Sequence, residues 1–126
     1  MDAMLKKKWL CALRYGNYEQ TKGRLRNDDG FCCLGVLCDL IDPKLWKKVG
    51  TAKEEKDNLY SYDSCGTGHL PEKLREEIGL SYRVQEIASE RNDAGDSFER
   101  IADWLEEIDL LEPDLSRGFD EDDYRD

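Results

Sequence analysis

Residues 30–40 read GFCCLGVLCDL and form the most apolar stretch of the chain. With the isoleucine that follows, the apolar run is eleven residues long, which favours a helix, although a short apolar run also fits a buried strand. Asp28 or Asp29 is placed to cap a helix, and an Asp-Pro pair after the run stops one. The stretch therefore predicts a helix over 31–41 that is apolar on every side and lies at the centre of the fold.

Gly35 lies in the middle of this predicted helix. A glycine there costs about 1 kcal/mol of helix propensity relative to alanine. We therefore expect the backbone of another segment to pack closely against the helix at this position.

Four further segments have the sequence features of helices. The first ends at Gly16, the third is capped by Ser81, and the last is capped by Asp96 or Ser97 and has the clearest apolar stripe. The second has a proline in its first turn and a glycine at its end. These segments cover residues 4–15, 70–80, 81–93 and 94–111.

The segments between these helices carry weaker signals. Residues 45–46 continue a short amphipathic turn with lysines outside, and Tyr60 and Tyr62 alternate as in a short strand. Residues 18–30 form a loop, and a short β-hairpin is possible near residues 18–27 or 59–63. The expected fold is mainly α, with four or five helices around the buried central helix, and an α+β fold with a short hairpin stays open as the alternative.

Length and composition place the chain among small globular proteins. It has 126 residues, 39% apolar and 38% charged, and no apolar run approaches the roughly 20 residues of a membrane span. We expect one domain over residues 1–112, followed by an acidic, flexible tail over 113–126. The start of the chain has no secretory signal, so we expect a cytoplasmic protein without a membrane association.

Charge is unevenly distributed along the chain. The net charge is −10, but residues 1–27 hold seven basic and two acidic residues, a balance of +5. In an extended backbone the alternating positions from 18 to 26 lie on the same side, which predicts a basic face with one aromatic ring. Arginine suits bidentate contacts to phosphate or carboxylate, and tyrosine stacks on bases. The predicted ligand-binding residues are Arg14, Tyr18, Gln20, Lys22, Arg24 and Arg26.

Backbone amides at the start of the central helix, near Asp29 and Gly30, are expected to add donors for the same anion. The competing interpretation is that the arginines only form surface ion pairs. Their partners would be Asp28, Asp29, Glu106 or Glu107.

The five cysteines are interpreted as reduced thiols that serve as small core residues. A metal site or a Cys/His nucleophilic pair at Cys65 and His69, with Cys38 as a further ligand, is the alternative. The chain has a single histidine and no hydrolase or P-loop motif. We therefore predict no catalytic residue, no metal and no cofactor.

The stretch KWLCALRYGNYEQTKGRLRNDDGFCCLGVLCDL over residues 8–40 resembles the opening of a group of small proteins encoded by tailed bacteriophages. The shared pattern reads W-x-x-A-L-R-x-G-x-Y-x-Q, then L-R, then G-x-C-C-L-G-V-L-C-D. Residues 70–74 and 90–107 resemble later segments of the same group. The resemblance implies a phage accessory protein that acts in the bacterial cytoplasm, and it supplies no catalytic residues. The matching positions are Trp9, Ala12, Leu13, Arg14, Gly16, Tyr18, Gln20, Leu25, Arg26, Gly30, Cys32, Cys33, Leu34, Gly35, Val36, Leu37, Cys38 and Asp39.

The expected function is binding. The first hypothesis is a protein that counters host defence by binding an anionic small molecule, such as a nucleotide signal, or a host protein. The alternatives are an acidic mimic of nucleic acid that inhibits a basic host protein, and a small metal- or cysteine-dependent enzyme. We do not expect direct binding of nucleic acid, and homo-oligomerisation is left open.

Overall fold

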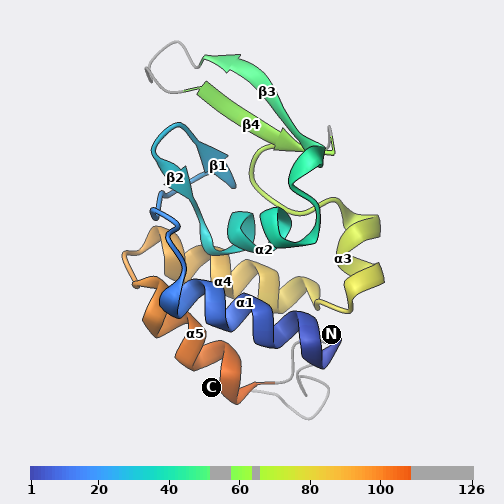
Figure 1. Cartoon of the computed structure of the whole chain (residues 1–126), viewed down its shortest axis with the longest axis vertical. Coiled ribbons are helices and arrows are strands. Elements are labelled where there is room, and N and C mark those ends of the chain that lie inside the picture. The colour runs from blue at the N-terminus through green and yellow to red at the C-terminus, as the bar shows by residue number, and fades with distance from the viewer. Residues whose placement is uncertain (52–57, 64–65, 109–126) are drawn as a thin grey trace.

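The computed structural model describes residues 1–51, 58–63 and 66–108, and these ranges contain five α-helices and one four-stranded sheet (Figure 1). The predicted tail, residues 113–126, lies outside the described residues. The helices are α1 (Ala3–Tyr15), α2 (Cys33–Ile41), α3 (Glu72–Ile78), α4 (Tyr82–Asp93) and α5 (Phe98–Glu107), with a 3-10 turn over Pro43–Leu45. The strands are β1 (Arg26–Asn27), β2 (Gly30–Phe31), β3 (Trp46–Thr51) and β4 (Asn58–Tyr62).

The outer helices begin and end where the capping residues predicted. Ser81 and Ser97 accept hydrogen bonds from the backbone amides of Val84 and Arg100, at the starts of α4 and α5. Gly79 ends α3 with a φ of 75°, the left-handed conformation that favours glycine. The predicted positions of these helices are therefore confirmed, and α5 buries the expected apolar stripe of Phe98, Ile101, Ala102 and Leu105.

The central helix is confirmed, but it starts two residues later than predicted. Cys32 caps α2, and its Sγ accepts a hydrogen bond from the Gly35 amide at 3.4 Å. Asp28 and Asp29 are therefore not its caps, because the residues before Cys32 turn into the β1–β2 hairpin instead. A side chain at Gly35 would place its Cβ 1.9 Å from the carbonyl oxygen of Leu25, which confirms the expected close approach of another backbone.

The prediction of a mainly α fold is wrong, because the chain is α+β. The four strands form an antiparallel sheet in the order β2-β1-β4-β3. The expected turn at Trp46 is the start of β3, whose conformation depends on pairing with β4, Trp46 opposite Tyr62. This strand could not be predicted from the sequence, because the lysines after Trp46 are typical of an exposed edge strand and also of a turn. The strand expected from the alternation of Tyr60 and Tyr62 is confirmed as β4.

Helix α2 lies between two layers, with the sheet on one side and helices α1, α4 and α5 on the other (Figure 1). Its residues from Cys33 to Cys38 are all buried. Trp9 of α1 is fully buried against it, and the indole nitrogen of Trp9 donates a hydrogen bond to the carbonyl oxygen of Cys33 at 2.9 Å. Residues 16–25 connect α1 to β1, and they contact α2 at Gly35 and α4 at Asn92. None of the helices in the described ranges has the length and apolar character of a membrane span.

Candidate functional site

The loop that carries the predicted site is held by the C-terminal end of α4. The side-chain amide of Gln20 donates to Asn92 Oδ1 and to the carbonyl oxygen of Asp96, both at 2.8 Å. Asn92, which is fully buried, donates in turn to the carbonyl oxygen of Thr21 at 2.7 Å. The amide of Gly23 donates to Asp93 Oδ1 at 2.8 Å. Gln20 is therefore engaged in holding the loop.

The extended basic face is not present in the structure. Between residues 18 and 27, the only named strand is β1 at Arg26 and Asn27. Gly23 has a φ of 79°, so the side chains before and after it do not alternate as they would in one extended strand. Lys22 is exposed, and Arg24 donates a hydrogen bond to the carbonyl oxygen of Gly23 at 2.8 Å. The six predicted residues therefore do not share one surface. Tyr18 and Arg26 line one pocket, and Arg14 lines a different groove.

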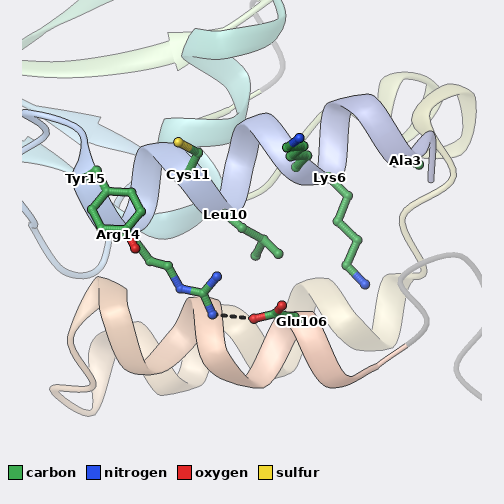
Figure 2. Close-up of a pocket in the computed structure, with 8 residues that line it drawn as sticks. Ala3, Lys6, Leu10, Cys11, Arg14, Tyr15 and Glu106 are labelled. Atoms are coloured by element: carbon green, nitrogen blue, oxygen red, sulfur yellow. Dashed lines mark hydrogen bonds and ion pairs between the residues drawn. The ribbon is translucent and has the colours of Figure 1, made fainter.

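Arg14 forms the ion pair that the competing interpretation predicts. Its guanidinium donates to Asp103 at 2.7 Å and to Glu106 at 2.6 Å, both on α5. Figure 2 shows the pair with Glu106. The hydrogen bonds to Asp103 and then to Glu106 raise the pKa of Arg14 further above its usual range. Arg14 lies at the edge of a groove of about 440 Å³, here called the α1 groove, which is lined by Ala3, Lys6, Lys7, Leu10, Cys11, Arg14, Tyr15 and Glu106.

Arg26 lies among three aromatic rings. Its guanidinium carbon is 4.3 Å from the centre of the Tyr60 ring, 5.0 Å from that of Phe31 and 5.4 Å from that of Trp46. Cation–π contacts of this kind contribute about 0.5–2 kcal/mol each. No residue in the described ranges accepts a hydrogen bond from this guanidinium or forms an ion pair with it. Its N–H groups therefore remain available to a ligand.

A pocket of about 270 Å³ lies beside Arg26 and is here called the Arg26 pocket. Besides Arg26, its charged lining residues are the carboxylates Glu19, Asp28 and Asp29, so the single arginine faces an acidic rim. The Tyr60 hydroxyl donates to Asp28 Oδ1 at 3.3 Å. The remaining lining residues are Asn17, Tyr18, Asn27, Gly30, Phe31 and Tyr60.

Asp39 on α2 holds two of the aromatic residues in place. Its carboxylate accepts hydrogen bonds from the Tyr18 hydroxyl at 2.7 Å and from the Trp46 indole nitrogen at 3.1 Å. Tyr18 packs edge to face on Phe31 with 5.0 Å between ring centres. Burial, and then the hydrogen bond to Asp39, raise the pKa of Tyr18 to about 12. Tyr18 is therefore a neutral hydrogen-bond donor at physiological pH, and its ring forms a fixed wall.

The backbone amides expected to bind an anion are already occupied. Asn27 Oδ1 accepts hydrogen bonds from the amides of Asp29 at 2.9 Å and Gly30 at 3.1 Å. The start of α2 is also buried, and the amide of Cys33 donates to Asn92 Oδ1 at 3.2 Å. The expectation of an anion at the start of this helix is therefore wrong, because the hairpin turn and α4 use these donors.

The cysteines show no assembled reactive site within the described ranges. Cys32, Cys33 and Cys38 are buried and unpaired, and burial raises the pKa of Cys32 to about 11. No group of three or more metal-ligating side chains occurs in this part of the chain, where His69 is exposed. Cys65, the other residue of the alternative site, lies outside the described residues.

Four residues that surround or support Arg26 could not be predicted from the sequence. These are Phe31, Asp39, Trp46 and Tyr60. The sequence pattern places Phe31 in the central helix and Trp46 in a turn. Only the alternation of Tyr60 and Tyr62 signalled a strand that brings a ring to this place. The sequence gives no indication that Phe31, Trp46 and Tyr60 meet around Arg26, or that Asp39 holds Trp46 there.

The chain belongs to the family of the domain of unknown function DUF8296, which matches residues 1–109. No curated protein and no solved structure matches the chain.

Proposed function

We propose that this DUF8296 protein is a binding protein that takes an anionic small molecule against Arg26. One observation carries the proposal. The Arg26 guanidinium lies against three aromatic rings, and no described residue accepts a hydrogen bond from it. Arginine stacked in this way presents a planar set of donors that suits a phosphate or carboxylate. The rings of Tyr18 and Phe31 in the pocket lining suit a planar group of the same ligand.

The acidic rim narrows the class of anion. Glu19, Asp28 and Asp29 line the same pocket as Arg26, so they repel a ligand with several negative charges. A nucleotide with a phosphodiester carries one charge per phosphate, and the amino groups of its bases are donors for carboxylates. Such a nucleotide fits the pocket better than a triphosphate does.

Two measurements test this proposal. Native mass spectrometry of the chain purified from bacterial cells is expected to show an added mass of a few hundred daltons, absent from Arg26→Ala. Calorimetry with 3′,5′-cyclic AMP and ATP as probes is expected to show tighter binding of the cyclic nucleotide. Arg26→Ala is expected to weaken that binding about tenfold to a hundredfold, because hydrogen bonds to charged groups contribute about 1.5–3 kcal/mol.

Arg91→Ala is the matched control. Arg91 lies 4.8 Å from the centre of the Trp104 ring but donates to Asp96, so it is a stacked arginine with a paired charge. Its loss is expected to leave ligand binding unchanged. A bare chain in native mass spectrometry, together with no response to either nucleotide, would overturn the proposal.

The wider role is proposed on the sequence resemblance alone. In this proposal the chain is a phage accessory protein that removes a nucleotide signal of host defence in the bacterial cytoplasm. The acidic mimic would depend on residues 113–126, which lie outside the described residues, and no contact in the described ranges favours it.

A further inference from the structure

The α1 groove lies away from the Arg26 pocket and shares no lining residue with it. Leu10, which is 8% exposed, contributes only a small apolar floor, and the ion pair between Arg14 and Glu106 closes the side toward α5. Figure 2 shows the side chains of Lys6, Leu10 and Arg14 directed from α1 toward α5. The groove therefore has a small apolar floor and a charged edge.

The outer side of α1 exposes apolar side chains, and two of them, Cys11 and Tyr15, also line the groove. Met4 is 63% exposed and Tyr15 is 80% exposed, and these are two of the four large apolar side chains that are exposed in the described ranges. Cys11 is also exposed, and the spacing of Met4, Cys11 and Tyr15 by seven and four residues places them on one side of the helix. The buried residues of the helix are Trp9, Leu10 and Leu13. No described residue covers the exposed side.

The charge around the groove is opposite to that of the whole chain. Its lining holds two lysines and one arginine against one glutamate, whereas the chain has a net charge of −10. Arg14 is already paired with Asp103 and Glu106, and Lys6 donates to the carbonyl oxygen of Ile108. No described residue pairs with the ammonium groups of Lys7 or Lys8. Two unpaired lysines beside exposed apolar side chains complement a surface that is both acidic and apolar.

We propose that the α1 groove docks an acidic amphipathic helix of a partner protein. The apolar side chains of the partner lie on Met4, Cys11 and Tyr15, and its carboxylates lie against Lys7 and Lys8. A partner protein fits better than an anionic membrane, because the acidic body of the chain would be repelled by anionic lipids. This site is independent of ligand binding at Arg26.

The test uses a fluorescent label on Cys11 in the full chain carrying Cys65→Ser. The other cysteines, Cys32, Cys33 and Cys38, are buried and protected from labelling. The probes are two peptides of 14 residues with the same leucine pattern, one with glutamate and one with lysine at the polar positions. The acidic peptide is expected to change the emission and to saturate, and the basic peptide is expected to have no effect.

Charge reversal on α1 provides the specific variant. Lys7→Glu with Lys8→Glu is expected to weaken binding of the acidic peptide by about tenfold or more at low salt, and 1 M salt is expected to have a similar effect. The matched control is Lys47→Glu with Lys48→Glu on β3, an equal charge change at another exposed surface, which is expected to leave binding unchanged. Circular dichroism establishes that both variants are folded.

Four results would overturn the proposal. These are no response to the acidic peptide, an equal response to the basic peptide, and a response to anionic vesicles of phosphatidylglycerol in place of the peptide. The fourth concerns the labelled chain without peptide. If neutralising the acidic residues 120–123 changes its emission, the groove belongs to the chain's own C-terminal segment.

Discussion

Arg14 and Arg26 belong to the same basic segment of the sequence, but the structure holds them in opposite ways. Arg14 donates to two carboxylates of α5 at 2.6 and 2.7 Å, so its charge is already paired. Arg26 lies over three aromatic rings and has no acceptor in the described ranges. An aromatic surface fixes a guanidinium without using its hydrogen-bond donors, whereas an ion pair uses them. The difference identifies Arg26, and not the basic segment as a whole, as the candidate binding group.

The two surfaces also depend on different parts of the fold. The α1 groove is built mainly from one helix, with Glu106 of α5 at its edge. The Arg26 pocket is built from the loop after α1, the β1–β2 hairpin and β4, and it is supported by α2 and α4. A substitution in α4 that releases the loop after α1 is therefore expected to separate the two surfaces.

The largest effect is expected from Gly35→Ala. The added Cβ would lie 1.9 Å from the Leu25 carbonyl oxygen, and neither backbone can move without shifting the core. The expected cost is about 3 kcal/mol of unfolding free energy or more, measured by urea denaturation, with loss of the Arg26 pocket. Gly68→Ala is the control, because no atom lies within 4 Å of its added Cβ. An unchanged midpoint for Gly35→Ala would contradict the close contact between Leu25 and α2.

A smaller effect, confined to one surface, is expected from Asn92→Ala. Asn92 accepts from Gln20 and Cys33 and donates to Thr21, so its loss leaves several buried polar groups unsatisfied. The expected cost is about 2–3 kcal/mol, with weaker ligand binding at Arg26.

Peptide binding to the α1 groove is expected to be unchanged in Asn92→Ala, because α4 contributes no residue to the groove. Glu90→Ala, at an exposed position of the same helix, is the control for a change in α4 itself. Equal loss of both binding activities would show that the two surfaces are not separable.

The smallest effect is expected from Tyr18→Phe and depends on pH. Burial and the hydrogen bond to Asp39 raise the pKa of Tyr18 to about 12 in the folded chain, against about 10 when unfolded. Its contribution to stability is therefore full below pH 10 and is lost as the pH rises through 12.

The free energy of unfolding of Tyr18→Phe is thus expected to fall less steeply between pH 10 and 12, as measured by urea denaturation. Part of the decline remains, because burial also raises the pKa of Tyr62. The same variant at pH 8 serves as the control, since the difference there reports only the lost hydrogen bond. Identical slopes for the two proteins would contradict the raised pKa of Tyr18.

The sequence by itself determined the helices, because caps, glycines and apolar stripes are local signals. Ser81, Ser97 and Gly79 mark helix ends through contacts within a few residues. The buried central helix and the close approach at Gly35 were also predicted, because a helix that is apolar all round has to be covered on every side. The sequence also predicted Tyr18 and Arg26 as ligand-binding residues, because the chemistry of a phenol ring and a guanidinium can be read from the residue type alone.

Only the tertiary structure decided which of those residues share a surface. β3 forms by pairing with β4, and both strands follow α2 in the sequence. This pairing places Trp46 and Tyr60 beside Arg26. Asn27 and Asn92 occupy the backbone amides that the sequence offered to an anion. Strand pairing and the use of hydrogen-bond donors depend on contacts between segments far apart in the chain, and local patterns carry no information about them.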